Sequence, residues 1–120
     1  MLTPLELDIM KAVWRQAPVT VRDVQQAIQA SRSLAYTTVL TIMDRLYHKG
    51  VLTRKLRSRT HLYEPVISYA EARDEAVHTL LRNFFEGSQE KFREYLDGDS
   101  IEPLADYGFA APSSLDETLL

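Results

Sequence analysis

The chain contains no cysteine, only four glycines and one tryptophan, and no long hydrophobic run. The lack of cysteine excludes disulfide bonds and cysteine-ligated metal sites. The lack of an apolar run of roughly 18 residues excludes a membrane-spanning helix. The first residues contain neither a basic segment nor a cleavage site, so we expect no secretory signal peptide and a cytoplasmic protein.

The sequence also lacks the patterns that carry catalytic chemistry. The three histidines, His48, His61 and His78, fall on three different predicted elements and do not have the spacing of metal ligands. There is no Ser-His-Asp order, no glycine-rich phosphate loop and no paired-carboxylate motif. We therefore expect no enzyme activity, no metal site and no cofactor.

The charged side chains are unevenly distributed along the chain. Residues 1–64 hold 10 Lys and Arg against 5 Asp and Glu, which gives this half a net charge of +5. Residues 65–120 hold 4 Lys and Arg against 12 Asp and Glu, which gives a net charge of −8. A basic first half favours binding to a polyanion such as nucleic acid. The acidic second half needs a different role.

Two capping boxes predict the first two helices. Thr3 and Glu6 begin one helix, which is expected to end before Pro18. Thr20 and Asp23 begin the next. Apolar residues recur at helical spacing in both helices, and those of the second are Val21, Val24, Ala27 and Ile28.

Residues 37–49 are predicted to form an amphipathic helix. At about 100° per residue, polar and apolar residues separate into two opposite arcs. The polar arc holds Thr37, Thr38, Thr41, Asp44, Arg45, His48 and Lys49. The apolar arc holds Val39, Leu40, Ile42, Met43, Leu46 and Tyr47. Ala35 is a poor cap and Ser33 is the alternative, whereas Gly50 is expected to end the helix.

A basic hairpin is expected immediately after this helix. Residues 51–56 and 60–65 are predicted to be strands, and the turn lacks an Asn-Gly pair, so we expect a longer and more mobile tip than a two-residue turn. The cations of the hairpin are Arg54, Lys55, Arg57 and Arg59. A charged edge that prevents aggregation is the alternative interpretation. Helix, glycine and basic hairpin together indicate a winged helix whose hairpin binds phosphates.

The second half is predicted to contain two more helices. One begins at a capping box after Ser68 and runs to about Phe85, and the second follows Gly87 and Ser88. The first half already closes a core, so the apolar residues here need another partner, and a second copy is the simplest one. The predicted dimerisation residues are Val77, Leu80, Leu81, Phe84, Phe85, Phe92 and Leu96.

The last part of the sequence changes in composition after residue 96. Residues 97–120 hold six acidic residues and no Lys or Arg, yet they keep scattered apolar side chains. We predict three parts: a winged-helix domain over residues 1–67, dimerisation helices over 68–96, and an acidic C-terminal tail of uncertain structure over 97–120. The predicted fold class is α+β and mostly helical, with a winged helix-turn-helix domain before the dimerisation helices.

Several motifs resemble the BlaI/MecI/CopY penicillinase-repressor family of winged-helix regulators. They are the stretch from Leu2-Thr3 to Trp14, Thr20-Val21-Arg22-Asp23-Val24, Tyr36-Thr37-Thr38-Val39-Leu40-Thr41, Arg45-Leu46, Lys49-Gly50, Arg59 and Tyr63 to Pro65. The resemblance implies a dimeric repressor on a dyad-symmetric operator and leaves room for an upstream sensor or protease. It implies recognition-helix roles for Thr37, Thr38, Thr41 and Arg45, and phosphate roles for Arg54, Arg57 and Arg59.

The chain departs from two branches of that family. The copper-responsive branch carries a C-terminal cysteine motif, which is absent here. The antibiotic-responsive branch is cut at an Asn-Phe bond after a Gly-Ser step, whereas the one asparagine of this chain, Asn83, precedes Gly87. We therefore predict a homodimeric DNA-binding repressor whose inducing signal is open. The alternatives are a winged-helix protein-interaction module and a hydrolase that uses an unforeseen metal.

Overall fold

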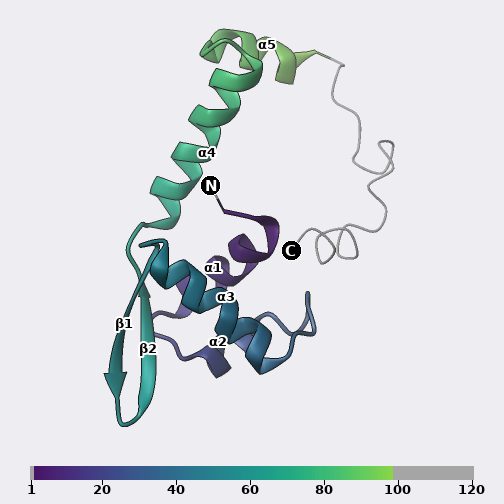
Figure 1. Cartoon of the computed structure of the whole chain (residues 1–120). Helices are drawn as coiled ribbons and strands as arrows, with labels where there is room; N and C mark the ends of the chain where they lie inside the picture. Colours follow the sequence, from purple (N-terminus) through teal and green to yellow (C-terminus); the bar gives the residue numbers. More distant parts are fainter. Residues whose placement is uncertain (1, 99–120) are drawn as a thin grey trace. The chain divides into compact units, whose positions relative to one another are not determined.

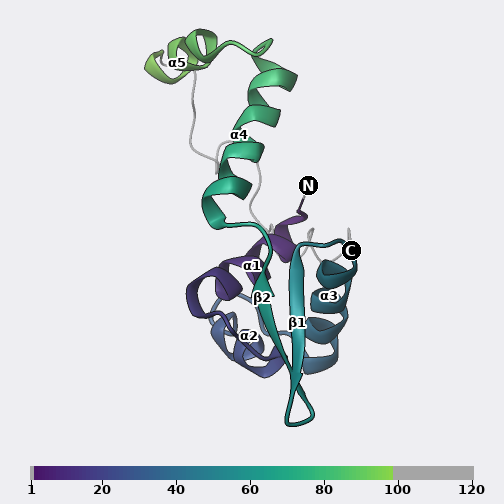
Figure 2. The same ribbon diagram turned by 90° about the vertical axis from the view of Figure 1, so that its left-hand side faces the viewer.

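The computed structural model describes residues 2–98, which fall into two compact units that meet between Tyr69 and Ala70. The elements are α1 (Pro4–Gln16), α2 (Val21–Ala27), α3 (Tyr36–His48), β1 (Leu52–Arg57), β2 (Thr60–Pro65), α4 (Tyr69–Phe84) and α5 (Gln89–Asp97). In the first unit the three helices lie against the β1–β2 hairpin, whose tip extends beyond them (Figures 1 and 2).

The two predicted capping boxes begin α1 and α2. The Thr3 hydroxyl accepts a hydrogen bond from the backbone N–H of Glu6 at 3.2 Å, and the Glu6 carboxylate accepts one from the Thr3 N–H at 3.0 Å. Thr20 and Asp23 make the same reciprocal pair, with both bonds at 3.0 Å. These bonds satisfy N–H groups that the first turn of a helix leaves unpaired, so local sequence is enough to fix both starts.

The apolar side of α3 faces the core. Val39, Ile42, Met43 and Leu46 are buried, as predicted. Leu40 is 38% exposed, which corrects its place in the apolar arc: it lies at the edge of that arc, where the helix turns away from its neighbours. Ala27 of α2 is exposed for the same reason. The helix begins after Ala35 without a side-chain cap.

The hairpin is an antiparallel pair with a two-residue turn. Leu52 pairs with Pro65 and Arg57 with Thr60, which leaves only Ser58 and Arg59 between the strands. Both turn residues have left-handed backbone angles, with φ of 50° and 68°. The expectation of a longer tip was wrong, because two residues with positive φ form the tight turn that suits the twist of a hairpin.

Tyr63 joins the hairpin to the helices. Its side chain is completely buried, and its backbone exchanges two hydrogen bonds with Val19, at 3.1 and 2.7 Å. The indole N–H of Trp14 donates to the Ile67 carbonyl oxygen at 3.0 Å and ties the chain after β2 to α1. The core is shared by α1, α2, α3 and both strands, so the three helices and the wing form one body.

The second unit is organised by the turn between α4 and α5. Glu86 and Gly87 have positive φ, and the Gly87 N–H donates to the Leu81 carbonyl oxygen at 2.8 Å, which closes α4. The Ser88 hydroxyl then caps α5 by accepting from the Lys91 N–H. The ring of Phe85 lies 5.1 Å from that of Phe92, between centroids, so the two helices contact each other at this turn.

Residues 97 and 98 end the described part of the predicted acidic tail, and the rest of the tail lies outside the described residues. No helix between residues 2 and 98 has the length and apolar character that crossing a membrane requires.

Candidate DNA-binding surface

The polar face of α3 is accessible along its length. Thr37, Thr38, Thr41 and Arg45 are all exposed. The Thr41 hydroxyl donates to the Thr37 carbonyl oxygen at 2.9 Å, which orients it along the helix. The structure thus brings together the four predicted recognition residues on one side of one helix. Short hydroxyls followed by a long cation are the side chains that read base edges in a major groove.

Arg57 and Arg59 lie at the tip of the wing, which is defined here as the β1–β2 hairpin. Both side chains are exposed, and neither takes part in an ion pair or hydrogen bond within residues 2–98. Arg57 ends β1, and Arg59 occupies the second position of the turn. Exposed guanidinium groups without a carboxylate partner are suited to bind phosphate oxygens.

Arg54 has a different environment from the two arginines at the tip. Its Nη1 lies 2.9 Å from Oδ1 of Asp44, and its guanidinium carbon lies 4.0 Å from the centre of the Tyr47 ring. The Arg54 side chain is only 23% exposed. The hydrogen bond to Asp44 raises the pKa of the Arg54 guanidinium above its usual value. The structure therefore places this predicted phosphate ligand in contacts within its own domain.

Asp44 lies at the centre of a small charged group at the C-terminal half of α3. One of its oxygens pairs with Arg54, and the other lies 3.5 Å from Nε2 of His48, one helical turn away. A carboxylate at the edge of the polar face repels phosphate unless a cation neutralises it. Asp44 thus contacts both His48 on its own helix and a cation from β1.

An ion pair with one buried partner connects the first turn of α1 to the residue that follows α3. The Lys49 ammonium, just after α3, lies 2.9 Å from both carboxylate oxygens of Glu6, whose side chain is 1% exposed. Burial raises the pKa of Glu6, but the hydrogen bonds from the Thr3 N–H and from Lys49 outweigh it, and the pKa is lowered from its usual value. Sequence reasoning assigned Glu6 only to a cap, because a distant ion pair leaves no local signal.

Two further contacts involve the elements around α3. The Arg32 Nε lies 2.7 Å from Asp8, and this pair ties the loop before α3 to α1. The guanidinium of Arg22, on α2, lies 5.5 Å from the ring centre of Tyr36, the first residue of α3. Both arginines come from outside α3, and the amphipathic pattern of that helix gave no signal for either.

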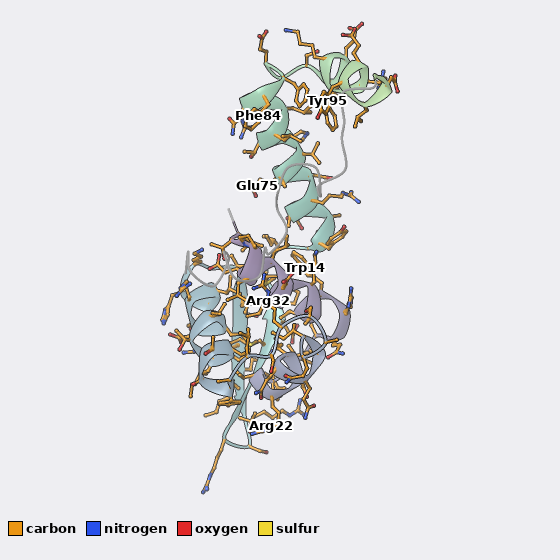
Figure 3. All side chains as sticks on the ribbon, turned by 90° about the vertical axis from the view of Figure 1, so that its right-hand side faces the viewer. Trp14, Arg22, Arg32, Glu75, Phe84 and Tyr95 are labelled. Carbon is orange, nitrogen blue, oxygen red and sulfur yellow. The ribbon has the colours of Figure 1, made fainter. Side chains whose placement is uncertain are left out.

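The predicted dimerisation residues separate into two groups. Leu81 is buried, and Phe85 and Phe92 contact each other inside the chain. Val77, Leu80, Phe84 and Leu96 are exposed, with fractions of 39%, 38%, 76% and 50%. Figure 3 labels Phe84 on α4 and Tyr95 on α5. A shallow groove between these helices is lined by Val77, His78, Leu81, Gln89, Phe92, Arg93 and Leu96.

The histidines do not form a metal site in the described part of the chain. Among residues 2–98 no group of three His, Cys, Asp or Glu side chains is close enough to hold a metal ion. His48 contacts Asp44, His61 lies beside the Tyr63 ring and His78 lines the groove on α4. Each histidine therefore has a separate environment.

The chain is similar to known proteins that are named as repressors or transcriptional regulators. The model of a family described as "Penicillinase repressor" matches residues 2–100. A transcriptional regulator BlaI of Mycobacterium tuberculosis is 42% identical over 81 residues, which are 67% of this chain and 56% of that protein. A penicillinase repressor of Bacillus licheniformis is 23% identical over 101 residues, which are 83% of this chain and 79% of the relative.

Solved structures give the same fold. The solution structure of the DNA-binding domain of the repressor BlaI is similar with a TM-score of 0.53 at 24% identity, over 59% of this chain and 87% of that one. The monomeric form of Bacillus licheniformis BlaI in complex with the blaP half-operator is similar with a TM-score of 0.51 at 24% identity, over the same shares. These likenesses confirm the predicted winged-helix fold. The part of the mycobacterial relative that this chain matches is 56% of that protein's length, or about half.

Proposed function

Because the chain belongs to the penicillinase repressor family, we propose that it is a transcriptional repressor that binds duplex DNA in a sequence-specific manner. The resemblance on which the motifs were first assigned is thereby confirmed at the level of the family. We propose that this role is carried out in the cytoplasm. The family is one of repressors, which agrees with the expectation that the chain is not an enzyme.

The observation that carries this proposal is the pairing of two exposed surfaces on one body. Thr37, Thr38, Thr41 and Arg45 face outward from α3, and the wing carries Arg57 and Arg59 at its tip. In a winged helix the recognition helix enters the major groove while the wing contacts the backbone. Since the hairpin and α3 share one core, both surfaces can engage the same duplex.

The start of α3 offers a further phosphate contact. Ala35 gives the helix no side-chain cap, and since the Thr38 N–H donates to the Ala35 carbonyl oxygen, the amides of Tyr36 and Thr37 are those offered to an anion. The N-terminus of a helix attracts a phosphate through these amides and through the helix dipole. The absence of a Ser or Asp cap, which weakens the helix alone, is consistent with a phosphate that caps it in the complex.

We further propose that the repressor is a homodimer joined through α4 and α5. Leu80 and Phe84 lie one turn apart on α4 and expose apolar surface that the described part of the chain does not cover. A two-fold dimer buries such a face and presents two winged helices to a dyad-symmetric site. Among the relatives, monomeric BlaI is described in complex with a half-operator, which fits one such domain per half-site.

Salt dependence of DNA binding tests the proposed function. Duplexes selected from a random library are bound at several salt concentrations by the wild type, by Arg57→Ala/Arg59→Ala, and by the control Arg82→Ala/Lys91→Ala on α4 and α5. Loss of two phosphate contacts in each domain reduces the slope of log affinity against log salt by about 1.8 for each bound domain, at about 0.9 for each contact. The control, which removes the same charge from the second unit, leaves the slope unchanged.

The same assay separates base recognition from backbone binding. Arg45→Ala and Thr38→Ala are expected to weaken discrimination at particular base pairs by about 1–3 kcal/mol, with a smaller effect on non-specific DNA. If the wild type shows no salt-sensitive binding to any duplex, the alternative of a winged-helix protein-interaction module replaces the proposed repressor.

A further inference from the structure

We propose that Arg54 is a positioning residue that anchors the wing to the recognition helix, and that it does not bind phosphate. This inference rests on the proposed function, because it concerns how the DNA-binding surface is held in shape. Its starting point is the difference in environment between Arg54 and the two arginines at the tip. Arg54 and Arg57 lie on the same strand, Arg59 lies in the adjoining turn, and all three side chains carry the same charge.

The contacts of Arg54 join two elements of the first unit. Arg54 belongs to β1, whereas Asp44 and Tyr47 belong to the C-terminal half of α3. The ion pair to Asp44 at 2.9 Å and the stacking on Tyr47 at 4.0 Å hold the guanidinium from two directions. A planar guanidinium can make both contacts at once, with its edge on a carboxylate and its face on a ring.

The position of this contact along β1 allows it to restrain the tip of the hairpin. Arg54 lies opposite Tyr63 in the strand register, and Tyr63 is buried in the core. Arg57 follows three residues later and ends the strand. Every residue of β1 that follows Arg54 is exposed, so this strand makes no contact with the core beyond Arg54. Arg54 is therefore the last residue of β1 before the tip that is not exposed.

The same contact also removes an unfavourable charge. Asp44 lies on the polar side of α3, where its carboxylate would face a DNA backbone. Arg54 neutralises that carboxylate within the domain, so a duplex can approach Arg45 without meeting an unpaired anion nearby. Arg57 and Arg59 have no such partner among residues 2–98 and keep their charge for phosphate.

Replacement by lysine distinguishes an anchor from a phosphate ligand. Lysine keeps the charge and can bind phosphate as a point charge, but it cannot stack on Tyr47 while its edge pairs with Asp44. We expect Arg54→Lys to weaken binding to the selected duplex by about threefold to tenfold, which is most of the loss seen for Arg54→Ala. The matched control Arg15→Lys, at an exposed arginine in the last turn of α1 outside the proposed DNA-binding surface, is expected to bind like the wild type.

A second variant removes the ring instead of the charge. Tyr47→Leu is expected to weaken binding by a factor similar to that of Arg54→Lys, with the salt slope unchanged, because no charge is lost. Arg57→Ala by contrast should reduce that slope by about 0.9 for each bound domain. If Arg54→Lys binds like the wild type while Arg54→Ala reduces the slope as Arg57→Ala does, Arg54 is a phosphate ligand and the proposal is overturned.

Hydrogen exchange in the free protein tests the anchor without DNA. Arg54→Lys and Arg54→Ala are expected to speed amide exchange in residues 52–57 by about fivefold or more relative to α1, because the hairpin opens locally more often. Arg57→Ala should leave this exchange at the wild-type rate. Unchanged exchange in both Arg54 variants overturns the anchor, whereas absence of DNA binding by the wild type overturns the proposed function alone.

Discussion

The two units of the chain use apolar side chains in opposite ways. In the first unit, fifteen hydrophobic residues from three helices and the hairpin form a closed core. In residues 70–98 of the second unit, Leu81 is the one buried hydrophobic residue, and Phe84 is 76% exposed. The charges are opposite as well, with +5 over residues 1–64 and −8 over residues 65–120.

Because of this difference, the two units are suited to different kinds of binding partner. The closed core of the first unit buries most of its large apolar side chains. Its net positive charge favours binding to a polyanion such as DNA. An apolar face without a cover needs a protein partner. Negative charge in the same region keeps it away from phosphate, so a partner of the same sequence can bind there without competition from DNA.

The largest expected effect comes from charges placed on the exposed face of α4. Leu80→Asp/Phe84→Asp puts two carboxylates where we propose a second copy to pack, and buried unpaired charges are strongly unfavourable. We expect sedimentation to show a monomer, and affinity for a full dyad site to fall by about 10²–10⁴-fold, toward that of a half-site.

Arg82→Glu is the matched control for this dimer test. It changes the net charge by the same amount, and Arg82 lies on the opposite side of α4 from Phe84 at about 100° per residue. This variant should remain dimeric. A wild type that sediments as a monomer at micromolar concentration, or a double variant that stays dimeric, removes the proposed role of α4.

The second largest effect is expected from a leucine-to-alanine substitution, which is made once in each unit. Leu46→Ala in α3 removes a fully buried side chain and is expected to lower the free energy of unfolding by about 2–5 kcal/mol. Leu80→Ala in α4 removes a side chain that is 38% exposed, so its cost to folding should stay below about 1 kcal/mol. Urea unfolding measures both; equal losses would mean that the face of α4 is part of the fold of a single chain.

Local chemistry explains which parts of the fold could be predicted from the sequence. The capping boxes of Thr3 and Thr20 depend on residues three apart, so both helix starts were correct. The tip of the wing was predicted wrongly, because neither Ser58 nor Arg59 is of a residue type that favours positive φ. The inward alternation of Leu52 and Tyr63 sets the register of the strands, and the register dictates a two-residue turn.

In the predicted site, too, features with a local sequence signal could be predicted and features set by tertiary contacts could not. Exposure of the α3 hydroxyls follows from helical periodicity, which is visible in the sequence. The partner of a cation is set by tertiary contact, so the pattern grouped Arg54 with Arg57 although their environments differ. Likewise, Leu81 and Phe85 matched the apolar stripe of α4, but the turn at Gly87 brings α5 back over them.

The smallest expected effect concerns two glutamates, one in each unit, whose pKa values are both lowered. Glu6 is buried against Lys49, whereas Glu86 pairs with Lys91 at 2.6 Å on the surface. The Lys91 hydrogen bond lowers the pKa of Glu86, but solvent screens a pair of this kind. We therefore expect a measurable contribution to stability from Glu6 and none from Glu86.

The pH dependence of unfolding tests this contrast with Glu6→Gln and Glu86→Gln. Because the pKa of Glu6 is lower in the folded state than its usual value of 4.5, the unfolded chain takes up the proton first as pH falls. The stabilisation by ionised Glu6 is thus complete above that usual value and is lost as pH falls through the folded pKa. Near neutral pH we expect Glu6→Gln to lower the free energy of unfolding by about 1–2 kcal/mol, and the gap to the wild type to close in acid. Glu86→Gln should follow the wild type at every pH; a constant gap for Glu6→Gln down to about pH 3 would show that the capping geometry, and not the charge on Glu6, provides the stability.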